Sequence, residues 1–129
     1  MVALGGTQGR VLLAVDDEPD ILETITGYLE VAMPGLRVLE ASSGEEALRV
    51  LEEHKVDLIL SDYRMPGMDG LQFLVRASSL LPDVPRLMMT ALPDARIAVA
   101  AVNDARIKAF LTKPVEPAAL RQALQEWMP

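Results

Sequence analysis

The sequence predicts one α/β domain, a doubly wound sandwich in which helices cover both faces of a five-stranded parallel sheet. Three observations predict this fold. The 129 residues match the usual length of a single domain. Short apolar runs alternate five times with amphipathic stretches, which is typical of a parallel sheet. Right-handed crossovers then place helices on both faces. We expect residues 1–9 to form a flexible tail and residues 10–129 to form the domain.

The first two strands are predicted to differ in burial. Residues 11–15 form a continuous apolar run, which is typical of a strand that is buried on both faces. A helix begins at Pro19, because proline suits the first helical position, and Pro34-Gly35 ends it. Residues 37–41 alternate between polar and apolar side chains. We therefore expect the second strand nearer an edge of the sheet.

The remaining elements follow the same alternation. Ser43 and Glu46 have the spacing of a capping box, so a second helix is expected to begin there. The third strand, residues 56–62, ends in a carboxylate, and a Pro66-Gly67 turn follows it. The other expected elements are a helix from about Asp69, a strand at 86–90, a helix at 94–104, a strand at 109–112 and a helix from Glu116.

Composition and charge exclude several classes of protein. The chain has 19 acidic and 12 basic residues, a formal net charge of −7, and no cluster of Lys and Arg that could neutralise phosphates. Nucleic-acid binding by this chain is therefore not expected. No apolar stretch reaches the roughly 20 residues that span a bilayer, and the first residues do not resemble a signal peptide. Without cysteine, disulfides and thiolate metal sites are excluded. We expect a cytoplasmic protein.

Polar residues stand where the predicted strands end. Asp16 and Asp17 follow the first strand, Asp62 ends the third, Thr90 ends the fourth and Lys113 follows the fifth. Open α/β sheets bind ligands at this edge. Three carboxylates in one crevice repel each other unless a cation compensates them, and Mg²⁺ prefers such oxygen ligands. A carboxylate beside Mg²⁺, with a hydroxyl and an ammonium nearby, is equipped for phosphoryl transfer that forms an acyl phosphate.

These residues belong to four motifs that occur in chain order. The motifs are Val15-Asp16-Asp17-Glu18, the run from Asp62 to Gly70, Thr90-Ala91 and the run from Phe110 to Pro114. With this set, the chain resembles a response-regulator receiver domain of two-component signalling, from Arg10 to about Met128. The resemblance implies a flavodoxin-like (βα)5 fold with the strand order 2-1-3-4-5.

The resemblance also implies a phosphoacceptor and its metal site. Asp62 matches the residue that takes a phosphoryl group from a sensor histidine kinase or a phosphotransfer protein. Asp16, Asp17, Asp62 and the backbone carbonyl of Arg64 match the ligands of Mg²⁺ or Mn²⁺. The implied protein is a signalling switch that catalyses only its own phosphorylation and dephosphorylation. It is not a turnover enzyme.

Other matching positions imply how the switch works. Thr90 and Lys113 match the hydroxyl and the cation that contact the phosphoryl group, Phe110 matches the aromatic switch position, and the Lys113-Pro114 bond is implied to be cis. The family uses the surface of its fourth helix, fifth strand and fifth helix to control an output domain, a target protein or a homodimer. The side chains of Arg64 and Leu92 are implied to tune the loss of the phosphoryl group.

Two features leave alternatives open. Residues 97–102 are apolar at every position, which indicates either a partner surface or alanines that only fill a helix. Ala105-Arg106 stands where the family commonly has Gly-Ala, so the shape of this loop is an open point.

Three other functions compete with the switch. A receiver-like adaptor would work without phosphorylation. An aspartyl-phosphate phosphohydrolase would need a second acid at the position of Arg64. A flavodoxin-like cofactor binder would need Ser, Thr and Gly where this chain has Asp16 to Pro19.

Overall fold

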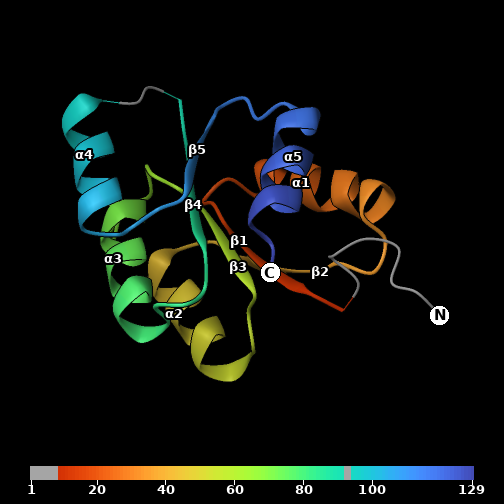
Figure 1. Ribbon diagram of the computed structural model, residues 1–129, viewed down its shortest axis with the longest axis horizontal. Helices are drawn as coiled ribbons and strands as arrows, with labels where there is room; N and C mark the ends of the chain where they lie inside the picture. The colour runs from red at the N-terminus through yellow and green to blue at the C-terminus, as the bar shows by residue number, and fades with distance from the viewer. Residues whose placement is uncertain (1–8, 92–93) are drawn as a thin grey trace.

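A five-stranded parallel sheet forms the centre of the molecule, with the order β2-β1-β3-β4-β5 (Figure 1). The computed structural model describes residues 9–91 and 94–129. The predicted fold class and strand order are confirmed. The strands are β1 (Val11–Val15), β2 (Arg37–Ala41), β3 (Leu58–Asp62), β4 (Arg86–Thr90) and β5 (Ala109–Thr112), and the helices are α1 (Pro19–Ala32), α2 (Gly44–Glu53), α3 (Gly70–Leu80), α4 (Ala95–Asn103) and α5 (Pro117–Trp127).

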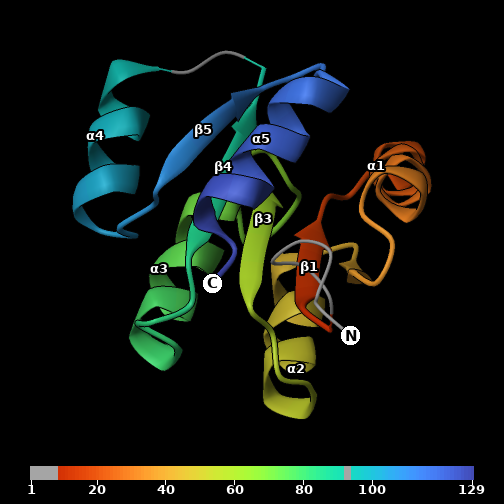
Figure 2. The same cartoon turned by 45° about the vertical axis from the view of Figure 1, so that its right-hand side comes forward.

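Helices cover both faces of the sheet, α1 and α5 on one face and α2, α3 and α4 on the other (Figures 1 and 2). Successive side chains of a strand point to opposite faces. Leu12 therefore packs with α1 and α5, while its neighbour Leu13 packs with the other helical layer. Two-sided burial explains why β1, β3 and β4 are apolar without alternation. The alternating β2 lies at an edge, as predicted.

The N-terminal caps of α2 and α3 in the second layer differ. The Ser43 hydroxyl accepts a hydrogen bond from the Glu46 backbone N–H, as predicted, at 3.1 Å. The Glu46 carboxylate accepts a hydrogen bond from the backbone N–H of Ser42 and not from that of Ser43, so the capping box is only half formed. A complete capping box joins Asp69 and Gln72 at the start of α3. Its Asp-x-x-Gln spacing was the signal in the sequence that could have predicted it.

Helix α4 is the least buried of the five helices. Of its residues only Ala101 is buried, whereas Val99 and Val102 expose 59% and 52% of their surface. Within the apolar run of residues 97–102, Val99 and Val102 therefore face away from the core, whereas the other four side chains are buried or half-buried. In the described part of the chain, no helix has both the length and the apolar character needed to cross a membrane.

The loop between α4 and β5 contains Arg106 in the left-handed region, with a φ of 52°. This conformation suits glycine and costs about 1 kcal/mol for a side chain with a Cβ. Arg106→Gly is therefore expected to raise the free energy of unfolding by about 1 kcal/mol, measured by urea denaturation. A decrease would contradict the assignment of strain, and Arg121→Gly, at an exposed position in α5, should instead destabilise the protein.

Candidate phosphoryl-transfer site

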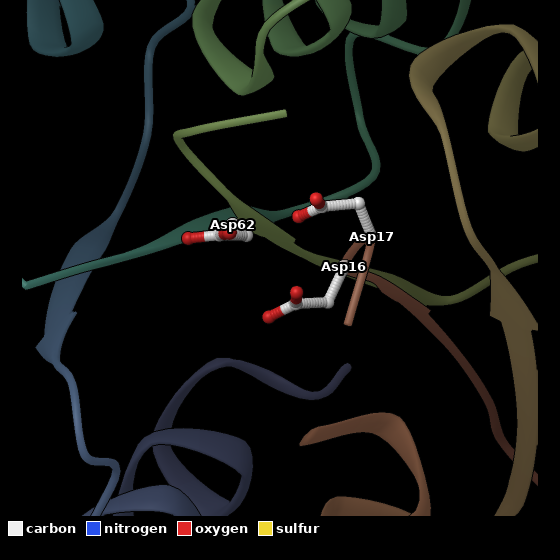
Figure 3. Close-up of side chains that lie close together, drawn as sticks. All are labelled: Asp16, Asp17 and Asp62. Carbon is white, nitrogen blue, oxygen red and sulfur yellow. The ribbon is translucent and has the colours of Figure 1, made fainter. Parts of the chain in front are cut away.

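The predicted site residues lie together at the carboxyl edge of the sheet. Asp16 and Asp17 follow β1, Asp62 and Thr90 end β3 and β4, and Lys113 follows β5. Figure 3 shows the carboxylates of Asp16, Asp17 and Asp62 directed toward a common space. One oxygen from each lies within 4.8 Å of the others. Parallel strands produce this convergence, because all their carboxyl ends meet at one edge.

Burial and charge make this cluster electrostatically costly. Asp16 is fully buried and Asp62 is 4% exposed, while Asp17 is half-buried. Burial and the negative charge of Asp16 raise the pKa of the Asp62 carboxyl above its ordinary value, although Lys113 opposes this rise. A cation placed between the carboxylates would therefore stabilise the ionised cluster.

Lys113 supplies one such charge. Its Nζ donates to Asp16 Oδ2 at 3.0 Å and lies 3.3 Å from Asp62 Oδ2. Burial disfavours the ammonium, but the hydrogen bond to Asp16 and the charge of Asp62 outweigh that penalty and raise the pKa of Lys113. Glu18 Oε1 lies 3.8 Å from the same nitrogen. Glu18 belongs to the first motif, but its contact with Lys113 is not evident from the sequence, because the two residues are far apart in the chain.

The donor set fits a hard divalent cation. Oxygens bound to one octahedral Mg²⁺ lie about 3 Å apart when adjacent and about 4.2 Å apart when opposite, so the three carboxylates, whose oxygens lie within 4.8 Å of one another, could bind one ion after moving closer together. Asp16 Oδ1 is held in place by the Glu18 backbone N–H at 2.9 Å. Arg64 follows Asp62 by two residues in the loop toward α3, and its side chain is exposed. The residues present therefore fit Mg²⁺ or Mn²⁺.

Thr90 and Phe110 lie on the same face of the sheet. Met88 pairs with Phe110 in the register, and Thr90 lies two residues further along β4. Thr90 is buried, and Phe110 is half-buried against the core of that face. The Lys113-Pro114 peptide bond is cis, as the resemblance implies. Leu92, implied to tune phosphoryl loss, lies outside the described residues.

Gly70, the last residue of the motif that begins at Asp62, packs against the backbone of Asp62. The Gly70 N–H donates to the Tyr63 carbonyl at 2.7 Å, and the Tyr63 N–H donates to the Met89 carbonyl at 3.0 Å. The first residue of α3 is thereby pressed against the end of β3. A Cβ on Gly70 would lie 1.9 Å from the Asp62 carbonyl oxygen. In the sequence, Gly70 is marked by its place in the motif from Asp62 to Gly70 and by the Asp-Gly pair at the predicted helix start, but neither feature indicates this close contact.

Comparisons with known proteins agree with this geometry. Residues 12–125 match the family model described as "Response regulator receiver domain". Over 115 residues, the chain is 42% identical to the transcriptional regulatory protein GlrR of Escherichia coli K12, covering 89% of this chain and 25% of that protein. It is 37% identical to the cyclic di-GMP phosphodiesterase response regulator RpfG of Xanthomonas campestris, covering 88% of this chain and 30% of that protein. The chain thus spans less than a third of either relative.

Solved structures resemble the whole domain. The signal receiver domain of an HD domain-containing protein from Pseudomonas fluorescens Pf-5 superimposes with a TM-score of 0.88 at 29% identity, covering 93% of this chain and 94% of that one. A CheY-like response regulator receiver domain protein from Methanospirillum hungatei reaches 0.85 at 31% identity, covering 91% of each chain.

Proposed function

Because the chain belongs to the response regulator receiver domain family, whose members are phosphoacceptor signalling domains of two-component systems, we propose that Asp62 accepts a phosphoryl group in a Mg²⁺-dependent reaction. The observation that carries this proposal is the cluster of three carboxylates around one space, with Lys113 bridging Asp16 and Asp62. The donor is the phosphohistidine of a sensor histidine kinase or of a phosphotransfer protein.

The residues of the site have separate roles in the transfer. An Asp62 carboxylate oxygen forms the new bond to phosphorus while the bond between phosphorus and the donor breaks, and its electron pair leaves with the donor. Lys113 moves from Asp62 to a phosphoryl oxygen, and the Thr90 hydroxyl donates to another. Asp16, Asp17, Asp62 and the Arg64 carbonyl would hold Mg²⁺, which would supply positive charge to neutralise the phosphoryl oxygens.

Metal dependence tests this proposal directly. Asp17→Asn is expected to weaken Mg²⁺ binding roughly tenfold or more, because one carboxylate ligand is lost. Phosphorylation by acetyl phosphate should slow by a similar factor at limiting Mg²⁺, and chelation should stop it in the wild type. Intact-mass spectrometry during a Mg²⁺ titration measures both effects. Asp20→Asn, in the exposed first turn of α1, is the matched control. Identical titration curves for Asp17→Asn and wild type would contradict the ligand role.

Phosphorylation is proposed to act through Thr90 and Phe110. When Thr90 moves toward the phosphoryl group, it vacates space that Phe110 can fill from the same face of the sheet. Phe110 has no hydroxyl, so its buried position needs no hydrogen bond. The surface of α4, β5 and α5 changes with it and controls an output domain, a target protein or a homodimer.

Phe110→Ala is expected to separate phosphorylation from this response. Asp62 should be phosphorylated within about twofold of the wild-type rate, because Phe110 donates no group to the reaction. Beryllofluoride, which mimics the phosphoryl group, should shift the amides of residues 94–112 and the association state in the wild type, and should shift them much less in the variant. NMR and light scattering measure these changes. If beryllofluoride changes neither quantity in the wild type, the switch mechanism is wrong.

The partners follow from the same proposal. GlrR is named a transcriptional regulatory protein and RpfG a phosphodiesterase response regulator, so segments similar to this chain occur in proteins whose names indicate different outputs. We propose that this chain acts in the cytoplasm through protein contacts and does not itself bind nucleic acid or membranes. Its net charge of −7 supports this, because it repels polyphosphates.

A further inference from the structure

One buried arginine holds the far end of α4. Arg86, the first residue of β4, is only 2% exposed. Its Nε donates to the Ala105 carbonyl at 2.8 Å, and its Nη2 lies 3.5 Å from the Arg106 carbonyl. Its Nη1 donates to the carbonyls of Leu81 and Val84 at 3.1 and 2.6 Å. Within residues 9–91 and 94–129, Arg86 forms no ion pair with a carboxylate.

A buried charge is tolerated only when its hydrogen bonds are satisfied. Here backbone carbonyls from two loops satisfy it, the loop before β4 and the loop between α4 and β5. The backbone of Arg86 adds another tie, because its carbonyl accepts from the Lys108 N–H at 2.8 Å. Burial and the charge of Arg106 lower the pKa of Arg86, but an arginine remains charged at neutral pH. Residues 105–108 are thus fixed to the sheet.

The first half of α4 has no comparable attachment in the described part of the chain. The only buried residue of α4, Ala101, lies in the second half of the helix, next to the buried Ala105 and Ile107. Ile97 instead borders a cavity of about 480 Å³, whose other walls include Tyr63 and Met65 in the loop after Asp62. Figure 2 shows α4 at the outer end of its helical layer, beside α3. The helix is anchored at one end and has free space beside the other.

We propose that the end of α4 held by Arg86 is a pivot, about which the first half of the helix tilts over the cavity beside Asp62. Local opening requires little loss of packing where few side chains are buried, so the motion is concentrated in residues 95–99. The pivot itself is independent of phosphorylation. Its use in signalling rests on the proposed function, because the cavity is lined by residues that directly follow the phosphoacceptor.

Amide hydrogen exchange on the unphosphorylated chain tests the pivot. The Ala98 N–H bonds to the Asp94 carbonyl, and the Ile107 N–H bonds to the Ala101 carbonyl. We expect Ala98 to exchange roughly tenfold faster than Ile107 after correction for intrinsic rates. In Arg86→Met, Ile107 and Lys108 should accelerate to the rate of Ala98. Leu13, at the centre of the sheet, reports global unfolding, and Arg121→Met on α5 is the matched control.

Each result has a defined meaning. Equal protection of Ala98 and Ile107 in the wild type overturns the pivot, and so does an Arg86→Met variant in which Leu13 and Ile107 accelerate by the same factor. If Arg86→Met does not fold, Arg86→Lys replaces it, because lysine keeps the charge but cannot reach both loops with a planar fork. With Mg²⁺ and beryllofluoride, the exchange rates of residues 95–99 should change by a much larger factor than those of residues 104–108. Equal changes overturn the pivot, whereas no change in either range contradicts the proposed function alone.

Discussion

Asp62→Asn is expected to abolish the phosphoryl mass gain that the wild-type chain shows with acetyl phosphate and Mg²⁺. An amide lacks the negative oxygen that forms the new bond to phosphorus. Intact-mass spectrometry measures the loss, and Asp83→Asn, at an exposed position in the loop before β4, is the matched control that should gain mass normally. A normal gain in Asp62→Asn would contradict the assignment of the acceptor. A wild-type chain that binds Mg²⁺ but never gains mass would instead support the phosphorylation-independent adaptor.

The free energy of unfolding of Asp62→Asn shows whether the variant is folded. The direction in which it differs from the wild-type value follows from the raised pKa of Asp62. Burial and Asp16 raise the pKa of Asp62, so the folded protein binds this proton more tightly than the unfolded chain does. The ionised carboxylate therefore destabilises the metal-free fold at neutral pH. Asp62→Asn should be more stable than wild type by about 1 kcal/mol there. This difference should shrink as the pH falls through the raised pKa toward the ordinary value.

Gly70→Ala is expected to damage both the fold and the site. The new Cβ would lie 1.9 Å from the Asp62 carbonyl oxygen and 2.8 Å from Tyr63 Cα. Because both atoms belong to the backbone, no side-chain rotation relieves the contact, and the start of α3 or the end of β3 must move. We expect a loss of about 4 kcal/mol in the free energy of unfolding. In any folded fraction, phosphorylation should slow by about 100-fold, since Asp62 would be misplaced.

Urea denaturation measures the first effect, and Gly27→Ala is its matched control. Gly27 lies within α1, and a Cβ there would meet nothing within 4 Å. That substitution should stabilise the protein by about 0.5–1 kcal/mol, because alanine is the better helix former. If Gly70→Ala were within about 0.5 kcal/mol of wild type, like an ordinary surface substitution, the close approach of α3 to the phosphoacceptor would be wrong.

The fold class and the edge of the sheet that carries the site could be predicted from the amino-acid pattern. The apolar run at β1 required burial on both faces, and Pro19 marked the start of α1. Asp62 could be placed at the end of β3 because the burial pattern of a strand is local. Parallel strands end at the same edge of the sheet, so Asp62 and Lys113 could be predicted to lie close together. Their charged atoms lie 3.3 Å apart.

The contacts that support the site and α4 could not be predicted in this way. The sequence predicts Arg86 only as the first residue of a strand, because two of the carbonyls that satisfy its buried charge belong to Ala105 and Arg106, 19 and 20 residues further along the chain. The sequence predicts Gly70 at the start of a helix, but it does not show that the backbone of Asp62 leaves no room for a Cβ at this position. Neither local periodicity nor spacing encodes such contacts. They depend on how closely separate elements approach, and that distance is set by packing across the whole domain.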